Sequence, residues 1–138
     1  MDDKDKKIVE ILMENARESY IGISKKVGLS EGAIRKRVKK LLDKGIIMGF
    51  QAKVNPRKVN LIESFTGIDV DPENLIDVLD KIYHKPEIRD IYLTSGDHNL
   101  ILRIIVDSIQ KMKEIHSYLE SLPGVKRICP AIVTEVIK

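Results

Sequence analysis

The sequence predicts an α+β protein in which three short helices precede a β-α-β-β-α-β unit. Apolar residues before position 45 recur at helical spacing in three segments, which glycine or polar residues separate. In the second half, residues 68–91 resemble residues 105–128, and each copy has the pattern of a strand end, a helix and a new strand. The charge also divides the chain, with 15 Lys and Arg against 8 Asp and Glu over residues 1–62 and 9 against 13 over residues 63–138.

Capping residues and apolar spacing locate the first three helices. Asp2 or Asp3 can cap the first helix, because a short polar side chain can accept a hydrogen bond from a free backbone N–H. Ser19 and Ser30 can cap the second and third, and Gly28 lies between them where left-handed backbone is needed. The expected apolar stripes of the three helices consist of Ile8, Ile11, Leu12, Ile23, Val27, Ile34, Val38, Leu41 and Leu42.

The third helix carries five cations in the six positions from Arg35 to Lys40. At about 100° per residue, Lys36, Lys39 and Lys40 project away from the apolar stripe, while Arg35 and Arg37 flank it. A basic helix face is more often only a solvated surface. Here a short helix, a glycine turn and a basic amphipathic helix follow one another, which is the arrangement that places a recognition helix in the DNA major groove. The sequence therefore predicts a helix-turn-helix, and the fold class that we expect for it is the winged type.

The predicted DNA contacts divide by position on this helix. Residues near its start can reach base edges, and Arg35 suits a bidentate contact with guanine. Lys39 and Lys40 are expected to meet phosphates, which give affinity and salt dependence. Arg37 has two interpretations, a DNA contact or a salt bridge to an acidic residue of the same domain. The predicted DNA-binding set is Ser30, Glu31, Gly32, Arg35, Lys36, Arg37, Lys39 and Lys40.

Two strand-helix-strand units in tandem form the ferredoxin-like β-α-β-β-α-β arrangement. Both helices should cover the same face of the sheet, with stripes formed by Leu75, Val78, Leu79, Ile82, Ile109, Met112, Ile115 and Leu119. The strand at 99–106 is apolar on both sides of its pleat apart from Arg103, so its second face also needs a cover. The simplest cover is the same sheet of a second subunit in a two-fold dimer.

The segment between the halves marks the domain boundary. Gly45 is expected to end the third helix, and residues 46–54 are expected to be extended. Residues 51–62 contain no acidic residue and include Asn55-Pro56, a turn signal. We predict a helix-turn-helix domain at 1–50, a linking strand and hinge at 51–62, and a ferredoxin-like domain at 63–138.

These motifs are similar to those of the Lrp/AsnC, or feast/famine, family of transcriptional regulators. The resemblance covers nearly the whole chain, and its most specific part is GLSEGAIRKRVKKLLDKGIIMGFQAKVNP, residues 28–56. The matching landmarks are Leu29-Ser30, Arg37-Val38, Leu41, Gly45-Ile46-Ile47 and Asn55-Pro56. The resemblance implies a helix-turn-helix, a linking strand and a C-terminal domain for effector binding and dimerisation. It also implies dimers whose linking strands and sheets associate, and which often assemble into tetramers, octamers or rings.

The resemblance also implies an effector site at the loop TSGDHNL, residues 94–100. In the family, amino acids or related metabolites bind between dimers near this loop, and an acidic residue can hold the ammonium group of the effector. Here Gly96-Asp97 is also a hairpin-turn signal, and His98 and Asn99 stand where the family commonly has a second acid. The predicted effector-binding residues are Gly96, Asp97, His98 and Asn99.

The expected function is therefore sequence-specific, DNA-binding transcriptional regulation in response to a small effector. The expected partners are double-stranded DNA, further copies of the chain, and an amino acid or related metabolite. Two alternatives stay open, an effector-independent protein that coats DNA and an RNA-binding module of the same topology. Against the RNA module, the strand at 99–106 has no aromatic residue on which bases can stack.

Other chemistry has no clear set of residues. His116 shares an apolar stripe and is expected at the edge of the core, and Cys129 lies in an apolar strand. Because no nucleophile and base stand at a readable spacing, we expect no enzymatic activity, catalytic residue, metal site or cofactor. No apolar run reaches the roughly 18 residues that span a bilayer, and no signal peptide is visible, so a cytoplasmic location is expected.

Overall fold

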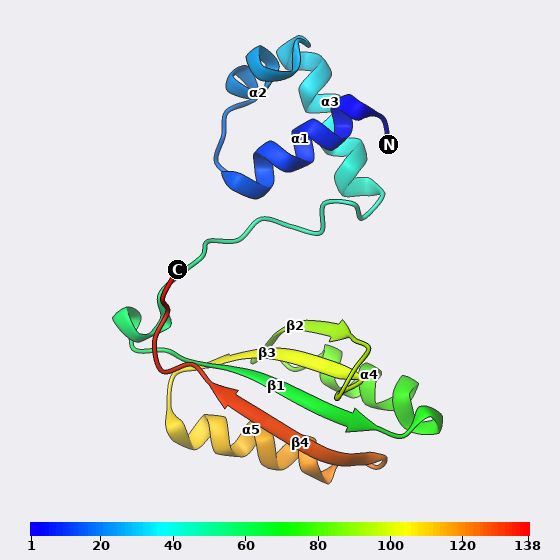
Figure 1. The fold of residues 1–138 in the computed structure, drawn as a ribbon, viewed down its shortest axis with the longest axis vertical. Helices are drawn as coiled ribbons and strands as arrows, with labels where there is room; N and C mark the ends of the chain where they lie inside the picture. Colours follow the sequence, from blue (N-terminus) through cyan, green and yellow to red (C-terminus); the bar gives the residue numbers. More distant parts are fainter. The chain divides into compact units, whose positions relative to one another are not determined.

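A computed structural model describes residues 1–138, which divide into two compact units, Met1–Lys53 and Val54–Lys138 (Figure 1). The first unit contains the helices α1 (Asp3–Glu14), α2 (Tyr20–Val27) and α3 (Glu31–Asp43). None of the helices in either unit is both long and apolar enough to cross a membrane.

The predicted caps begin the three helices. Asp2 caps α1, because its side chain accepts a hydrogen bond from the Asp5 backbone N–H at 2.8 Å, and the Asp5 side chain in turn accepts one from the Asp2 N–H. Ser19 and Ser30 cap α2 and α3, because their side chains accept hydrogen bonds from the N–H groups of Gly22 and Ala33. Gly28 has a φ of 80°, which places it in the left-handed region where glycine is favoured.

A small apolar core holds the three helices together. Leu42 was expected in this core but is 39% exposed, because Leu41 takes the inward position and the next residue lies about 100° further round the helix. Gly45 lies one residue beyond the cap Lys44, with a φ of 70°, and the Ile46 N–H donates to the Leu41 carbonyl. The buried core residues are Ile8, Leu12, Ile23, Val27, Ile34, Val38 and Leu41.

The segment that connects the two units forms no β-strand within the chain. Residues 46–55 lie outside every helix and strand, and a 3-10 helix follows at Pro56–Val59 with Asn55 as its cap. The predicted linking strand is therefore not formed by one chain alone. The physical reason is that an extended segment needs a neighbouring strand for its backbone hydrogen bonds.

The second unit has the predicted ferredoxin-like topology. Its sheet has the strand order β2-β3-β1-β4, and every neighbouring pair is antiparallel. In both copies of the internal repeat a strand begins two residues after the proline, at Ile88 after Pro86 and at Val125 after Pro123. The elements are β1 (Ile62–Val70), α4 (Leu75–Tyr83), β2 (Ile88–Leu93), β3 (Leu100–Val106), α5 (Ile109–Ser121) and β4 (Val125–Ile132).

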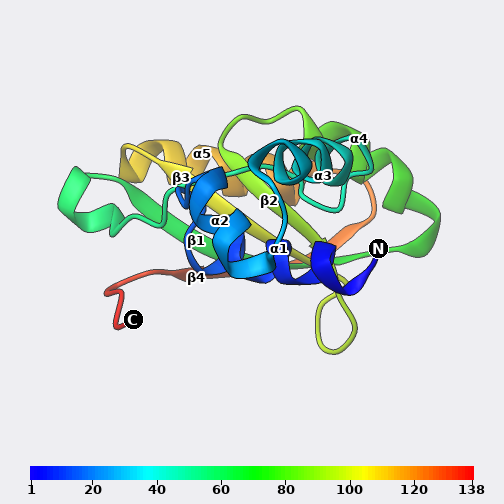
Figure 2. The same ribbon diagram turned by 90° about the horizontal axis from the view of Figure 1, so that it is seen from above.

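Both helices of this unit lie on one side of the sheet (Figure 2). Alternate residues of β3 face these helices and are buried, while Ile101, Arg103 and Ile105 on its other face are only half-buried. Ile109 was expected in the helix stripe that covers the sheet but is 67% exposed. It is the first residue of α5 and lines an open cavity with Ile62 instead of entering the core.

We name the sheet surface opposite the helices the open face. Phe65 on β1 and Tyr92 on β2 are 45% and 58% exposed on it. Arg103 at its centre donates hydrogen bonds to Glu63 on β1, at 3.0 Å, and to Asp90 on β2. The open face therefore combines a satisfied ion cluster with apolar side chains that nothing else in the second unit covers.

A chain of polar side chains crosses the helix side of the sheet. The buried Ser64 and Thr66 hydroxyl oxygens lie 2.8 Å apart, and Thr66 Oγ1 lies 2.7 Å from His116 Nε2 on α5. His116 is half-buried, at the edge of the core as predicted. Burial lowers the pKa of His116, because removal from water disfavours the imidazolium form.

This lowered pKa predicts an acid-sensitive contribution of His116 to stability. The folded protein favours the neutral ring, so the contribution is complete above the ordinary histidine pKa of about 6.5. It is lost as the pH falls below that value and through the lowered pKa of the folded state. Urea unfolding midpoints at pH 7.5 and pH 5.0 should therefore differ more in the wild type than in His116→Gln, which cannot titrate. An equal acid loss in both proteins would contradict this prediction.

Candidate functional site

The outer face of α3 presents the cations expected to meet DNA. Arg35, Lys36, Lys39 and Lys40 are all exposed, and neither Lys36 nor Lys40 has an ion-pair partner. A Cβ on Gly32 would have no other heavy atom within 4 Å. The start of this helix is therefore open for a close approach, and two of its ammonium groups are available to an anion.

Lys39 and Ser30 already have partners in the free protein. Lys39 Nζ lies 2.8 Å from an Asp43 carboxylate oxygen one turn later, and this hydrogen bond raises the pKa of Lys39. Both side chains are well exposed, so water and a phosphate can compete with the pair. The Ser30 hydroxyl is used as the α3 cap and accepts a hydrogen bond from the Ala33 N–H at 3.2 Å.

Arg37 forms the salt bridge that was one of its two interpretations. Its Nη1 lies 2.8 Å from an Asp2 oxygen and 3.0 Å from an Asp5 oxygen, so it ties α3 to the capping box of α1. The hydrogen bonds to Asp2 and Asp5 raise the pKa of Arg37, and the bond from Arg37 lowers the pKa of Asp2. Arg37 therefore lies on the flank that faces α1, away from the exposed outer face.

Arg35 is held on two sides. Its Nη2 donates to a Glu31 carboxylate oxygen at 3.0 Å, one turn earlier on α3. Its guanidinium carbon lies 4.9 Å from the centre of the Tyr20 ring, which belongs to the first turn of α2. The Arg35 side chain is nevertheless 62% exposed, so the remaining donors of its guanidinium face solvent.

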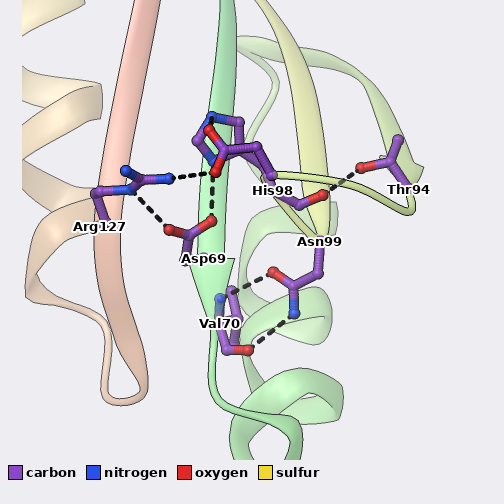
Figure 3. Close-up of polar contacts among 7 residues, drawn as sticks. Asp69, Val70, Thr94, His98, Asn99 and Arg127 are labelled. Carbon is purple, nitrogen blue, oxygen red and sulfur yellow. Dashed lines mark hydrogen bonds and ion pairs between the residues drawn. The ribbon is translucent and has the colours of Figure 1, made fainter.

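The loop between β2 and β3 carries the predicted effector-binding residues. The Thr94 N–H donates to the Asn99 carbonyl at 3.0 Å. The Thr94 hydroxyl donates to the His98 carbonyl at 2.7 Å (Figure 3), and the two bonds close the loop. Gly96 at its tip has a φ of 110°, in the region that favours glycine. Figure 2 shows this loop projecting from the sheet on the side away from the helices.

Two of the four predicted effector residues turn toward the sheet. The Asn99 side-chain amide accepts from the Val70 N–H at 2.9 Å and donates to the Val70 carbonyl at 2.8 Å (Figure 3). It thus satisfies both backbone groups of Val70, as a neighbouring strand would. His98 Nδ1 lies 2.9 Å from an Asp69 carboxylate oxygen. A Cβ on Gly67 would overlap the His98 ring, so glycine at this strand position makes room for the imidazole.

Two charged residues near this loop, Asp69 and Arg127, were not predicted from the sequence. Arg127 on β4 donates to Asp69 at 2.7 Å and to Asp97 at 3.1 Å, while Asp97 itself is 79% exposed. The pKa of Asp69 is lowered, first by the hydrogen bond from His98 and then by that from Arg127. A signal existed in the strand alternation, because Asp69 and Arg127 occupy facing positions of two neighbouring strands.

Comparison with known families assigns both units. Residues 1–48 match the family described as winged helix-turn-helix DNA-binding, and residues 63–138 match the Lrp/AsnC ligand binding domain. The chain belongs to the Lrp/AsnC family. The HTH-type transcriptional regulator LrpA of Pyrococcus horikoshii is 40% identical to this Lrp/AsnC protein over 140 residues, which cover 100% of this chain and 99% of the relative. Ptr1 of Methanocaldococcus jannaschii is 35% identical over 113 residues, 81% of this chain and 76% of the relative.

Solved structures of Lrp/AsnC proteins share the fold. A transcriptional regulator from Neisseria meningitidis, solved as a complex with L-methionine, has a TM-score of 0.73 and 25% sequence identity over 100% of this chain and 92% of its own. AsnC of E. coli has a TM-score of 0.70 and 26% identity over 100% of this chain and 95% of its own.

Proposed function

We propose that this Lrp/AsnC protein is a sequence-specific, DNA-binding transcriptional regulator that responds to a small effector and acts in the cytoplasm. The observation that carries the proposal is the outer face of α3, which is cationic and open at Gly32. Because α3 follows α2 through the left-handed Gly28, it corresponds to the second helix of a helix-turn-helix, the helix that enters the major groove.

The contacts of α3 assign different roles to its cations. Arg35 and Lys36, in the second turn, read base edges together with Glu31 and Gly32 in the first. Lys39 and Lys40 bind phosphates, and Lys39 leaves Asp43 to do so. Ser30 supports the helix start as its cap. Arg37 has a structural role in the proposal, since its Nη1 is shared between Asp2 and Asp5.

Selection from a random pool of DNA duplexes tests the function. A two-fold dimer should enrich an imperfect palindrome whose half-sites lie one helical turn apart or a multiple of it, roughly 34–36 Å per turn. Retention without sequence enrichment, which falls steeply with salt, would support the alternative of a protein that coats DNA. Retention of single-stranded RNA alone would reject both.

The proposed division of labour follows the units of the chain. Residues 1–50 bind DNA, residues 51–62 form the hinge and linking strand, and residues 63–138 dimerise and bind the effector. The linking strand forms only when a second copy supplies its neighbour. The open face is the proposed dimer contact, because no other element of the second unit covers Phe65 and its apolar neighbours.

The effector site that we propose uses the exposed pair Asp97 and Arg127. An α-amino acid carries one ammonium and one carboxylate group, which match these two side chains in charge. Asp97 takes the ammonium and Arg127 takes the carboxylate, so the zwitterion replaces an ion pair that water already screens. The side chains of His98 and Asn99 shape the loop from beneath, through Asp69 and Val70. The relative that was solved with L-methionine supports an amino acid as the effector class.

Asp97→Ala is expected to abolish the thermal shift that a matching amino acid produces, because the ammonium group loses its carboxylate. The measurement is the melting temperature of the protein with each member of an amino-acid panel. Asp80→Ala on α4 is the matched control, since its side chain is also 79% exposed. An unchanged shift in Asp97→Ala, or no shift with any amino acid for the wild type, would reject this site.

A further inference from the structure

Tyr20 lies on α2 and contacts Arg35, one of the proposed base-reading side chains of α3. Its ring is half-buried and packs against the apolar core of the first unit. The guanidinium carbon of Arg35 lies 4.9 Å from the centre of this ring, within the range of a cation–π interaction. The ring is therefore a platform that the core holds in place.

Arg35 is the one cation of the outer face with two restraints. Glu31 accepts a hydrogen bond from Nη2 on the same helix, and the Tyr20 ring of α2 contacts the guanidinium carbon. Lys36 and Lys40 have neither an ion-pair partner nor an aromatic contact. A guanidinium group that is already ordered loses less conformational freedom when it binds the edge of a base. The matching base is therefore bound more tightly relative to the other bases.

We propose that Tyr20 is a positioning residue for sequence readout, which orders the Arg35 guanidinium before DNA binds. The inference rests on the proposed function, since it concerns how α3 reads its site. It predicts that Tyr20 acts through Arg35 and not through a DNA contact of its own.

The first test needs no DNA. Relaxation of the Arg35 side-chain Nε in ¹⁵N-labelled protein reports motion on the picosecond to nanosecond timescale. In Tyr20→Leu, which keeps an apolar side chain against the core, the order parameter of Arg35 Nε should fall. In Tyr20→Phe, which keeps the aromatic face, it should match the wild type. Equal order parameters in all three proteins would overturn the inference, whatever the outcome of DNA selection.

The second test uses a duplex selected by the wild-type protein and a copy with one base pair changed at the position that Arg35 reads. Tyr20→Leu should lower the discrimination between these duplexes roughly two- to fivefold, the size of one exposed cation–π contact. Binding to random duplex and its salt slope should be unchanged. Tyr20→Phe should discriminate as well as the wild type. If the Tyr20 hydroxyl acted instead by binding a DNA phosphate, Tyr20→Phe would lose that contact.

A double-variant cycle separates positioning from a merely structural role. If Tyr20 acts through Arg35, the variant with both Tyr20→Leu and Arg35→Ala should discriminate no worse than Arg35→Ala alone. Additive losses, or an equal loss of affinity on every duplex, would overturn the inference and leave the proposed function intact. Failure of the wild type to select any sequence would reject the proposed function together with the inference.

Discussion

Replacing Phe65 by glutamate is expected to convert the protein into a folded monomer that binds its selected DNA at least about a hundredfold more weakly. Phe65 lies on the open face of a central strand and is 45% exposed, and the proposed dimer covers its side chain with a second copy. Two charges facing each other across a two-fold contact would oppose dimerisation. The loss of DNA affinity follows because each half-site then binds independently, without the effective concentration of a linked partner.

Light scattering after size-exclusion chromatography would measure the mass, and fluorescence anisotropy would measure DNA binding. The single chain should tolerate Phe65→Glu, because Arg103 is the directly facing residue on β3. Tyr83→Glu is the matched control, since Tyr83 is an exposed aromatic residue on α4, away from the open face. An oligomer of unchanged mass in Phe65→Glu would place the subunit contact elsewhere.

Arg35→Ala is expected to reduce discrimination at one base pair of the selected site roughly 5- to 150-fold, the equivalent of about 1–3 kcal/mol for a bidentate contact. Its effect on random duplex should be small, because Arg35 is restrained by Glu31 and Tyr20 instead of reaching freely for phosphates. Lys40→Ala should behave in the opposite way. It should weaken binding to every duplex alike and reduce the slope of log K against log salt by about 1.

Anisotropy titrations of both variants at several salt concentrations, with selected and random duplexes, would measure the two effects. Lys113→Ala on α5 is a control for the loss of one positive charge, since Lys113 lies in the other unit of the chain. Equal effects of Arg35→Ala and Lys40→Ala on both kinds of duplex would contradict the division between base and phosphate contacts.

The local elements of this protein follow from short-range features of its sequence. Short polar caps such as Ser19 and Ser30, a left-handed glycine at position 28 and the spacing of apolar residues act over one or two turns of chain. The internal repeat likewise determined the strand-helix-strand order, because Pro86 and Pro123 interrupt both copies before a new strand. The resemblance of residues 28–56 predicted the Lrp/AsnC family, and comparison with known proteins confirmed it.

Sequence patterns do not show which charged side chains are free and which are already bound, because that depends on how the helices and strands pack. Arg37 and Lys40 look alike in the sequence, yet Arg37 meets Asp2 and Asp5, which are more than 30 positions away along the chain, while Lys40 has no ion-pair partner. Local spacing cannot distinguish them, because the partner of Arg37 depends on how α1 packs against α3.

The same holds at the loop between β2 and β3. His98 and Asn99 read as loop residues open to an effector, but strand pairing brings Asp69 and Val70 beneath them, and Arg127 arrives from an edge strand on the other side of β1. Sequence patterns report neighbours within a few residues, whereas an ion pair or a stacking contact needs only proximity in space. The contacts of Tyr20 with Arg35 and of Arg127 with Asp97 therefore became visible only once the helices and strands were packed.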